Sequence, residues 1–166
     1  MSQTPQTGGV YLDTNILIAS IDQTDRHSTD VLKALEVLSR FPDINLYVSD
    51  WTIAEMKKVF VNERNYPPSD AKKISNRLKK RSTLRGHPFT IVPVRCKFQD
   101  FFESLYDFLT MKRRKGKGIN GLGDAIHCTI MKDNKISMIL STDDSSGLDL
   151  APNQILLRPE ELAKSF

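Results

Sequence analysis

The chain has too little cysteine for a disulfide-stapled or zinc-bound scaffold. Its 166 residues include only Cys96 and Cys128, which are far apart and lack metal-ligand spacing. No apolar run approaches the roughly 18 residues that a membrane-spanning helix needs, and the polar start differs from a secretory signal. We therefore expect a cytoplasmic protein with reduced thiols and no membrane contact. Residues 1–9 are expected to be a disordered leader, and residues 10–166 a single domain.

The positive charge is concentrated in two stretches of the chain. Seven of the 24 basic residues fall within residues 72–85 and five within 112–117, and neither stretch contains an acid. The rest of the chain therefore carries all 20 acidic residues against 12 basic ones. An acidic body with basic patches suits a polyanionic partner and a site that binds cations. The alternative is that both stretches are solvated surfaces, as charge runs often are.

Strand-like and helix-like segments alternate along the sequence. Short apolar runs at 10–12, 44–49, 89–94, 136–140 and 155–157 are typical of strands. Amphipathic spacing predicts a brief helix or turn at 16–21 and helices after Ser28, at 52–62, from 69 or 70 to about 84, after Asp100, from Asp124 and from Pro159. This alternation predicts one α/β domain built around a mostly parallel sheet.

Four acidic residues stand at the ends of these predicted elements. Asp13 and Asp143 follow strands, Asp124 begins a helix, and Glu55 lies early in another helix. Ligands of open α/β sheets gather at the carboxyl ends of the strands, and converging carboxylates repel one another unless a cation neutralises them. Oxygen ligands without a histidine or thiolate cluster favour Mg²⁺ or Mn²⁺ over zinc. The pattern therefore predicts a divalent-metal site suited to phosphodiester hydrolysis.

Each acid alone also has a structural interpretation. Asp13 and the Asp143-Asp144 pair suit turns, Asp124 suits a helix N-cap, and Glu55 suits a solvated helix surface. His127, three residues after Asp124, is interpreted as an ordinary helix residue, although it could orient a carboxylate. The order and setting of the four acids favour the metal site.

Four segments resemble the motifs of PIN-domain nucleases. Residues 11–17 (YLDTNIL) are similar to the first motif, Ser49 with 53–56 (IAEM) to the second, 123–126 (GDAI) to the third, and 141–143 (STD) to the fourth. The resemblance implies a three-layer α/β/α sandwich and a metal-dependent site that cleaves RNA. Asp13, Glu55, Asp124 and Asp143 would be the catalytic metal ligands, supported by Asn15 and Ser141, with Asp144 as the alternative fourth ligand.

The chain departs from compact toxin members of the family in its long basic segment between 62 and 88 and its dense basic run at 112–117. Basic segments would follow the RNA backbone. The RNA-binding residues expected there are Lys79, Lys80, Arg81, Lys112, Arg113, Arg114, Lys115 and Lys117.

The resemblance favours a VapC-like toxin of a type II toxin–antitoxin pair that cuts tRNA or rRNA, with a small antitoxin and a homodimer as its protein partners. Three alternatives remain open. One is an RNA-maturation PIN nuclease, and another is a non-catalytic RNA-binding protein. The third is a haloacid-dehalogenase-type phosphohydrolase with Asp13 as nucleophile, although Asn15 stands where that motif has a second aspartate.

Overall fold

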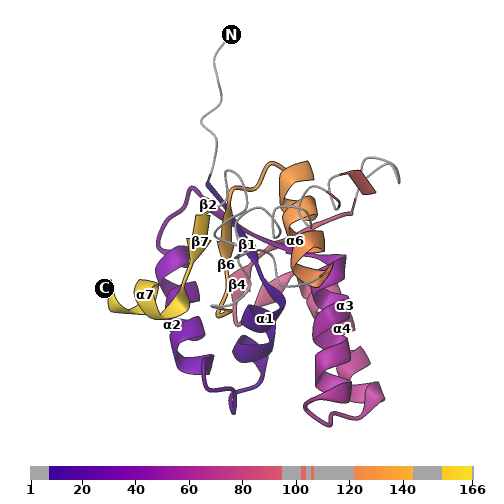
Figure 1. Cartoon of the computed structure of the whole chain (residues 1–166). Helices are drawn as coiled ribbons and strands as arrows, with labels where there is room; N and C mark the ends of the chain where they lie inside the picture. The colour runs from indigo at the N-terminus through magenta and orange to yellow at the C-terminus, as the bar shows by residue number, and fades with distance from the viewer. Residues whose placement is uncertain (1–7, 95–101, 104–105, 107–121, 144–154, 166) are drawn as a thin grey trace.

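A five-stranded parallel sheet forms the centre of the molecule (Figure 1). The computed structural model describes residues 8–94, 102–103, 106, 122–143 and 155–165. The strands are β1 (Gly8–Leu12), β2 (Ile44–Ser49), β5 (Thr90–Val92), β6 (Met138–Leu140) and β7 (Ile155–Leu157), in the spatial order β5-β2-β1-β6-β7. Each neighbouring pair is parallel. The predicted α/β class and parallel sheet are thus confirmed.

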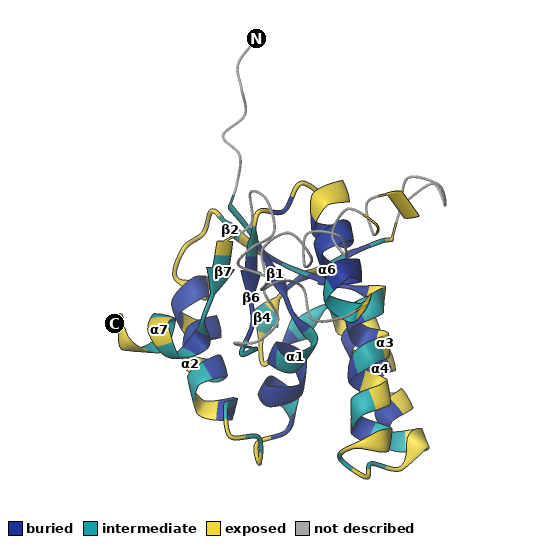
Figure 2. Cartoon of the chain, viewed as in Figure 1, coloured by how far each residue is buried: buried dark blue, intermediate teal, exposed yellow. Residues whose placement is uncertain are grey.

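Helices cover both faces of the sheet, as the alternation of side chains in β1 requires. Val10 and Leu12 point to the face that packs against α1 (Thr14–Ile21), α2 (Ser28–Ser39) and α3 (Asp50–Asn62). Tyr11 points to the opposite face, where it packs with α6 (Leu122–Asp133). All three β1 side chains are fully buried, and the buried core lies on both sides of the strands (Figure 2). The arrangement is the three-layer α/β/α sandwich.

Two further helices extend the first face. The basic helix α4 (Pro68–Arg81) packs along α3, and α7 (Pro159–Lys164) packs against α2. Among the described residues, no helix is long and apolar enough to cross a membrane.

The chain leaves α4 earlier than the sequence predicts. Ser82 adopts a left-handed backbone conformation with φ 49° and ends the helix, so Leu84 lies in a strand. The two-stranded hairpin of β3 (Thr83–Leu84) and β4 (His87–Pro88) follows. Its turn has positive φ at both Arg85 and Gly86, as tight hairpin turns require. The predicted helix boundary at about residue 84 is therefore wrong by three residues.

Most other element boundaries agree with the sequence prediction to within two residues. β2 and β7 match exactly, and β1 begins at Gly8 rather than at residue 10. The helix predicted after Asp100 and the basic loop at 112–117 lie largely or wholly outside the described residues.

Candidate metal centre

Asp13 lies where β1 ends and α1 begins. Its backbone N–H donates to Leu140 O (3.1 Å), which ties this turn to β6. Its side chain caps α1 by accepting from the Thr14 N–H at 2.6 Å. Ser141 Oγ and Asn15 Nδ2 both donate to Asp13 Oδ2, at 2.6 and 3.1 Å. The carboxylate is thus buried, with donors fixing both of its oxygens.

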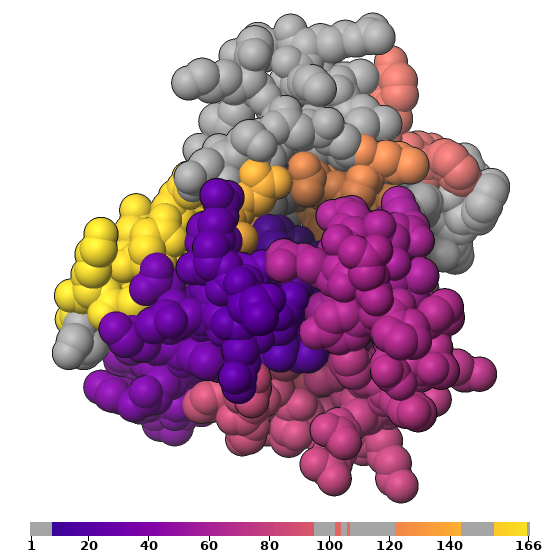
Figure 3. Space-filling view, turned by 90° about the horizontal axis from the view of Figure 1, so that it is seen from below, coloured from indigo at the N-terminus to yellow at the C-terminus, as the bar shows by residue number. Residues whose placement is uncertain are grey.

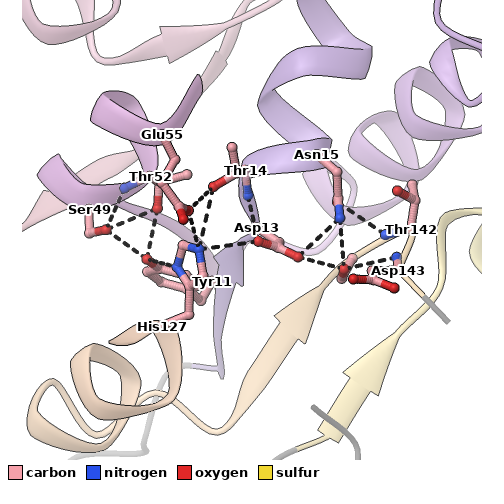
Figure 4. A network of polar contacts seen from close by, with 11 residues as sticks. Tyr11, Asp13, Thr14, Asn15, Ser49, Thr52, Glu55, His127, Thr142 and Asp143 are labelled. Atoms are coloured by element: carbon pink, nitrogen blue, oxygen red, sulfur yellow. Dashed lines mark hydrogen bonds and ion pairs between the residues drawn. The ribbon is translucent and has the colours of Figure 1, made fainter. Parts of the chain in front are cut away.

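Glu55 reaches the same region from α3. Thr14 Oγ1 donates to Glu55 Oε2 at 2.6 Å, and His127 Nε2 lies 2.7 Å from the same oxygen (Figure 4). Burial opposes charge on Glu55, but the hydrogen bond and charge of His127 outweigh it and lower the pKa of Glu55. The same contact raises the pKa of His127 against the effect of its burial. The two side chains therefore favour each other's charged forms.

Beneath this pair lies a buried polar network around the Tyr11 hydroxyl. The Tyr11 oxygen is 2.8 Å from His127 Nδ1, 2.6 Å from Ser49 Oγ and 2.7 Å from Thr52 Oγ1. Ser49 also caps α3 by accepting from the Thr52 N–H. Since His127 is only 2% exposed, both of its ring nitrogens need partners. The network therefore fixes the ring that holds Glu55.

Asp124 lies in the first turn of α6, half-buried beside the other acids. Burial and the charges of Asp13 and Asp143 raise its pKa to about 6. A β-carbon added at Gly123 would lie 2.8 Å from Glu55 Oε1. The glycine before Asp124 therefore lets α6 approach Glu55 closely.

The segment after β6 completes the acidic site. Ser141 Oγ accepts from the Asp143 N–H at 3.1 Å, and Asn15 Oδ1 accepts from the Thr142 N–H at the same distance. Asn15 and Ser141, predicted as supporting residues, thus join β6 to the Asp13 turn. Asp144, the alternative fourth ligand, lies outside the described residues.

All four predicted metal ligands line one cleft of about 450 Å³. The four acids come from the β1–α1 turn, α3, the start of α6 and the segment after β6. In the space-filling view a hollow opens where the indigo, magenta and orange segments meet (Figure 3). The cleft is lined by Asp13, Thr14, Asn15, Ile18, Asp25, Glu55, Lys58, Val59, Glu63, Arg64, Asp124, Thr142 and Asp143.

The donor chemistry of this cleft fits a hard divalent cation. The four acids supply oxygen ligands, and the charges of Asp13 and Asp143 add to the effect of burial in raising the pKa of Asp124. Within the described part of the chain, however, no three His, Cys, Asp or Glu side chains stand close enough together to form a ready-made metal site. Asp13 and Glu55 are instead engaged by hydrogen-bond donors.

Comparison with protein families matches residues 10–146 to the PIN domain. The chain belongs to the PIN domain family. No curated protein sequence matches it.

Solved structures share the PIN fold at low sequence identity. VapBC2 from Rickettsia felis, solved bound to a promoter DNA fragment, has a TM-score of 0.64 at 15% identity and covers 90% of this chain and 98% of its own. FitAcB from Neisseria gonorrhoeae has a TM-score of 0.62 at 17% identity, and the match covers 90% of this chain and 97% of FitAcB. VapC20 from Mycobacterium tuberculosis, a sarcin-ricin loop cleaving toxin, has a TM-score of 0.57 at 13% identity. The match covers 86% of this chain and 95% of VapC20.

The predicted RNA-binding residues on α4 do not line the cleft of this PIN domain. Lys79 forms an ion pair with Asp50 at 2.8 Å, and Lys80 and Arg81 are exposed on the helix. Lys112, Arg113, Arg114, Lys115 and Lys117 lie outside the described residues.

For His127 the sequence favours an ordinary helix residue, with orientation of a carboxylate as the alternative. In the structure its ring contacts Glu55 and lies 3.4 Å from Asp13 Oδ1, as the alternative requires. Its spacing of three residues from Asp124 was the available signal, because residues three apart share a helix face. Its other partner, Tyr11 on β1, could not be paired with it from spacing alone.

Proposed function

We propose that this PIN domain is an endoribonuclease that hydrolyses phosphodiester bonds of RNA with Mg²⁺ or Mn²⁺. The observation that carries the proposal is the convergence of four carboxylates, from four separate segments of the chain, on one cleft. Family membership supports a nuclease over a haloacid-dehalogenase-type phosphohydrolase.

Asp13, Glu55, Asp124 and Asp143 would hold the metal. When bound, a divalent cation lowers the pKa of a coordinated water and stabilises charge on a phosphate oxygen. Asp13 enters this role already oriented by Ser141, Asn15 and the Thr14 backbone. Glu55 is oriented by Thr14 and His127, and such supporting partners keep metal ligands in place.

The cellular role that we propose is the toxin of a type II toxin–antitoxin pair, silenced by a small antitoxin protein. The fold likeness to VapBC2, FitAcB and VapC20 supports this role. An RNA-maturation nuclease is the competing role. Growth arrest on expression of the wild-type chain, absent for Asp13→Asn, would support the toxin, whereas normal growth alongside cleavage in vitro would favour maturation.

Cleavage of a labelled single-stranded RNA tests the activity directly. We expect wild-type protein to cleave it with Mg²⁺ or Mn²⁺ and to stop when EDTA is added. Asp13→Asn and Asp124→Asn should lose cleavage by at least about a hundredfold, because each removes a ligand charge from the cleft. Asp43→Asn, which changes an exposed acid away from the cleft, is the matched control. Normal cleavage by both cleft variants would overturn the proposal.

A further inference from the structure

The acidic cleft has a cationic wall that the sequence analysis did not identify. Among the described residues that line the cleft, six are acids and two, Lys58 and Arg64, are bases. The surplus of acids repels a phosphate backbone, and positive charge beside the acids offsets that repulsion. Both bases come from α3 and the turn that follows it.

Arg64 is held in place before any ligand arrives. One guanidinium nitrogen lies 2.6 Å from Asp25 Oδ2, and the other terminal nitrogen lies 3.4 Å from Asp22 Oδ2. The two aspartates are nearly buried, while the Arg64 side chain keeps 34% of its surface exposed. An arginine carries five N–H donors in a rigid fork, so the exposed part can still donate to phosphate oxygens. Its orientation by the aspartates lowers the entropic cost of that contact.

Lys58, unlike Arg64, is not held by an acidic partner in the described part of the chain. Its side chain is exposed, and among the described residues it forms no salt bridge. It follows Glu55 by three residues on the same face of α3, which places its backbone about 4.5 Å further along the helix axis. Its charge already acts on the cleft, since it contributes to lowering the pKa of Glu55. A lysine ammonium on its flexible stem can therefore bind a phosphate that lies beside the acids.

We propose that Lys58 and Arg64 form a phosphate-binding wall that holds the RNA strand along α3 as it leaves the acidic site. The inference rests on the proposed function and deepens it. The wall binds backbone phosphates, because an ammonium and a guanidinium are both cationic donors to phosphate oxygens. It gives the strand one direction across the cleft, from the acids past Lys58 to Arg64. Helix α4 then has a lesser share in binding than its charge suggests.

The test is the salt dependence of RNA binding. Full-length protein is titrated into a fluorescein-labelled, mixed-sequence single-stranded RNA 12-mer in Ca²⁺, and fluorescence anisotropy is measured from 50 to 300 mM KCl. Each phosphate contact to a single strand contributes about −0.7 to the slope of log affinity against log salt. Lys58→Met should make the slope shallower by about 0.7 and weaken binding roughly fivefold. Arg64→Lys, which keeps charge but loses the fork, should weaken binding with a smaller change of slope.

The control is Lys57→Met, which changes the exposed neighbour of Lys58 that does not line the cleft in the described structure. It should bind like wild type, and thermal unfolding should show that all variants are folded. If wild type binds and cleaves RNA but Lys58→Met and Arg64→Lys match Lys57→Met, the phosphate wall is wrong and the nuclease stands. If Lys80→Met makes the salt slope shallower and the two wall variants do not, α4 is the binding surface and the phosphate wall is wrong. If wild type neither binds nor cleaves RNA, both proposals fail together.

Discussion

At the scale of single residues, His127 explains how a glutamate on a helix surface becomes a site residue. Its ring joins Glu55 on one side to the Tyr11 hydroxyl on the other, at 2.7 and 2.8 Å. Sequence spacing places Glu55 on the correct helix but gives no reason for its side chain to turn inward. That reason is a buried imidazole contributed from the other face of the sheet.

Replacing His127 by alanine should reduce RNA cleavage about 10- to 100-fold, the usual cost of removing a group that orients a metal ligand. His127→Gln, whose amide can donate to Glu55, should recover part of this loss. The rates are measured at saturating Mn²⁺, and His27→Ala, which removes a histidine from the start of α2, serves as the control. Equal loss in the alanine and glutamine variants would contradict the positioning role.

Asp124 gives the metal-free protein a stability that depends on pH. Its native pKa of about 6 exceeds the ordinary 3.8, so between these values the native state holds a proton that the unfolded chain has lost. The free energy of unfolding therefore falls as pH rises from about 3.8 to about 6, because the native carboxyl must give up its proton at a cost that the unfolded chain does not have.

Asp124→Asn should therefore stabilise the metal-free protein at pH 8 by about 1 kcal/mol, a figure discounted because the carboxyl is only half-buried. The difference should shrink toward zero below about pH 3, where the wild-type carboxyl is mostly protonated in both states. Urea unfolding in EDTA measures both values. If the variant is less stable than wild type at pH 8, the ionised carboxylate of Asp124 stabilises the native state, and the expected direction is wrong.

At the scale of elements, the carboxyl ends of β1 and β6 and the starts of α3 and α6 meet at one cleft. The strand order with β1 between β2 and β6 brings this about. The alternation in the sequence predicts the parallel sheet but not this order. The end of α4 could not be predicted in the same way. Ser82 and Arg85 adopt positive φ without being glycine, and this depends on the packing of the hairpin. Arg85 in fact donates to Ser20 O at 2.7 Å, so one of the basic residues is structural.

Gly123 links the position of α6 to the geometry of Glu55. Gly123→Ala should reduce cleavage roughly tenfold, because the new β-carbon would displace Glu55 Oε1 from its present position. Alanine also favours the helix by up to about 1 kcal/mol, so thermal stability should hold or rise. Activity and melting temperature are measured on the same preparation. Unchanged activity would mean that Glu55 tolerates the shift.

At the scale of the whole molecule, the sequence predicted the fold class and the location of the acids because both follow from local pattern. The parallel sheet needs only alternating elements, and Asp13, Asp124 and Asp143 stand at their ends. The cationic wall needed three-dimensional information. Lys58 and Arg64 stand as single charges in the sequence, whereas a dense basic run such as that on α4 predicts RNA binding. The residues predicted on α4 are not among those that line the cleft.

The proposed nuclease activity depends above all on binding of a divalent cation by the acidic cleft. Isothermal titration of Mn²⁺ into the protein measures this without requiring an RNA substrate. We expect saturable binding to wild type and to the Asp43→Asn control, and affinity at least about tenfold weaker for Asp13→Asn and Asp124→Asn. Equal Mn²⁺ affinity in all four proteins, or none in wild type, would contradict the metal centre.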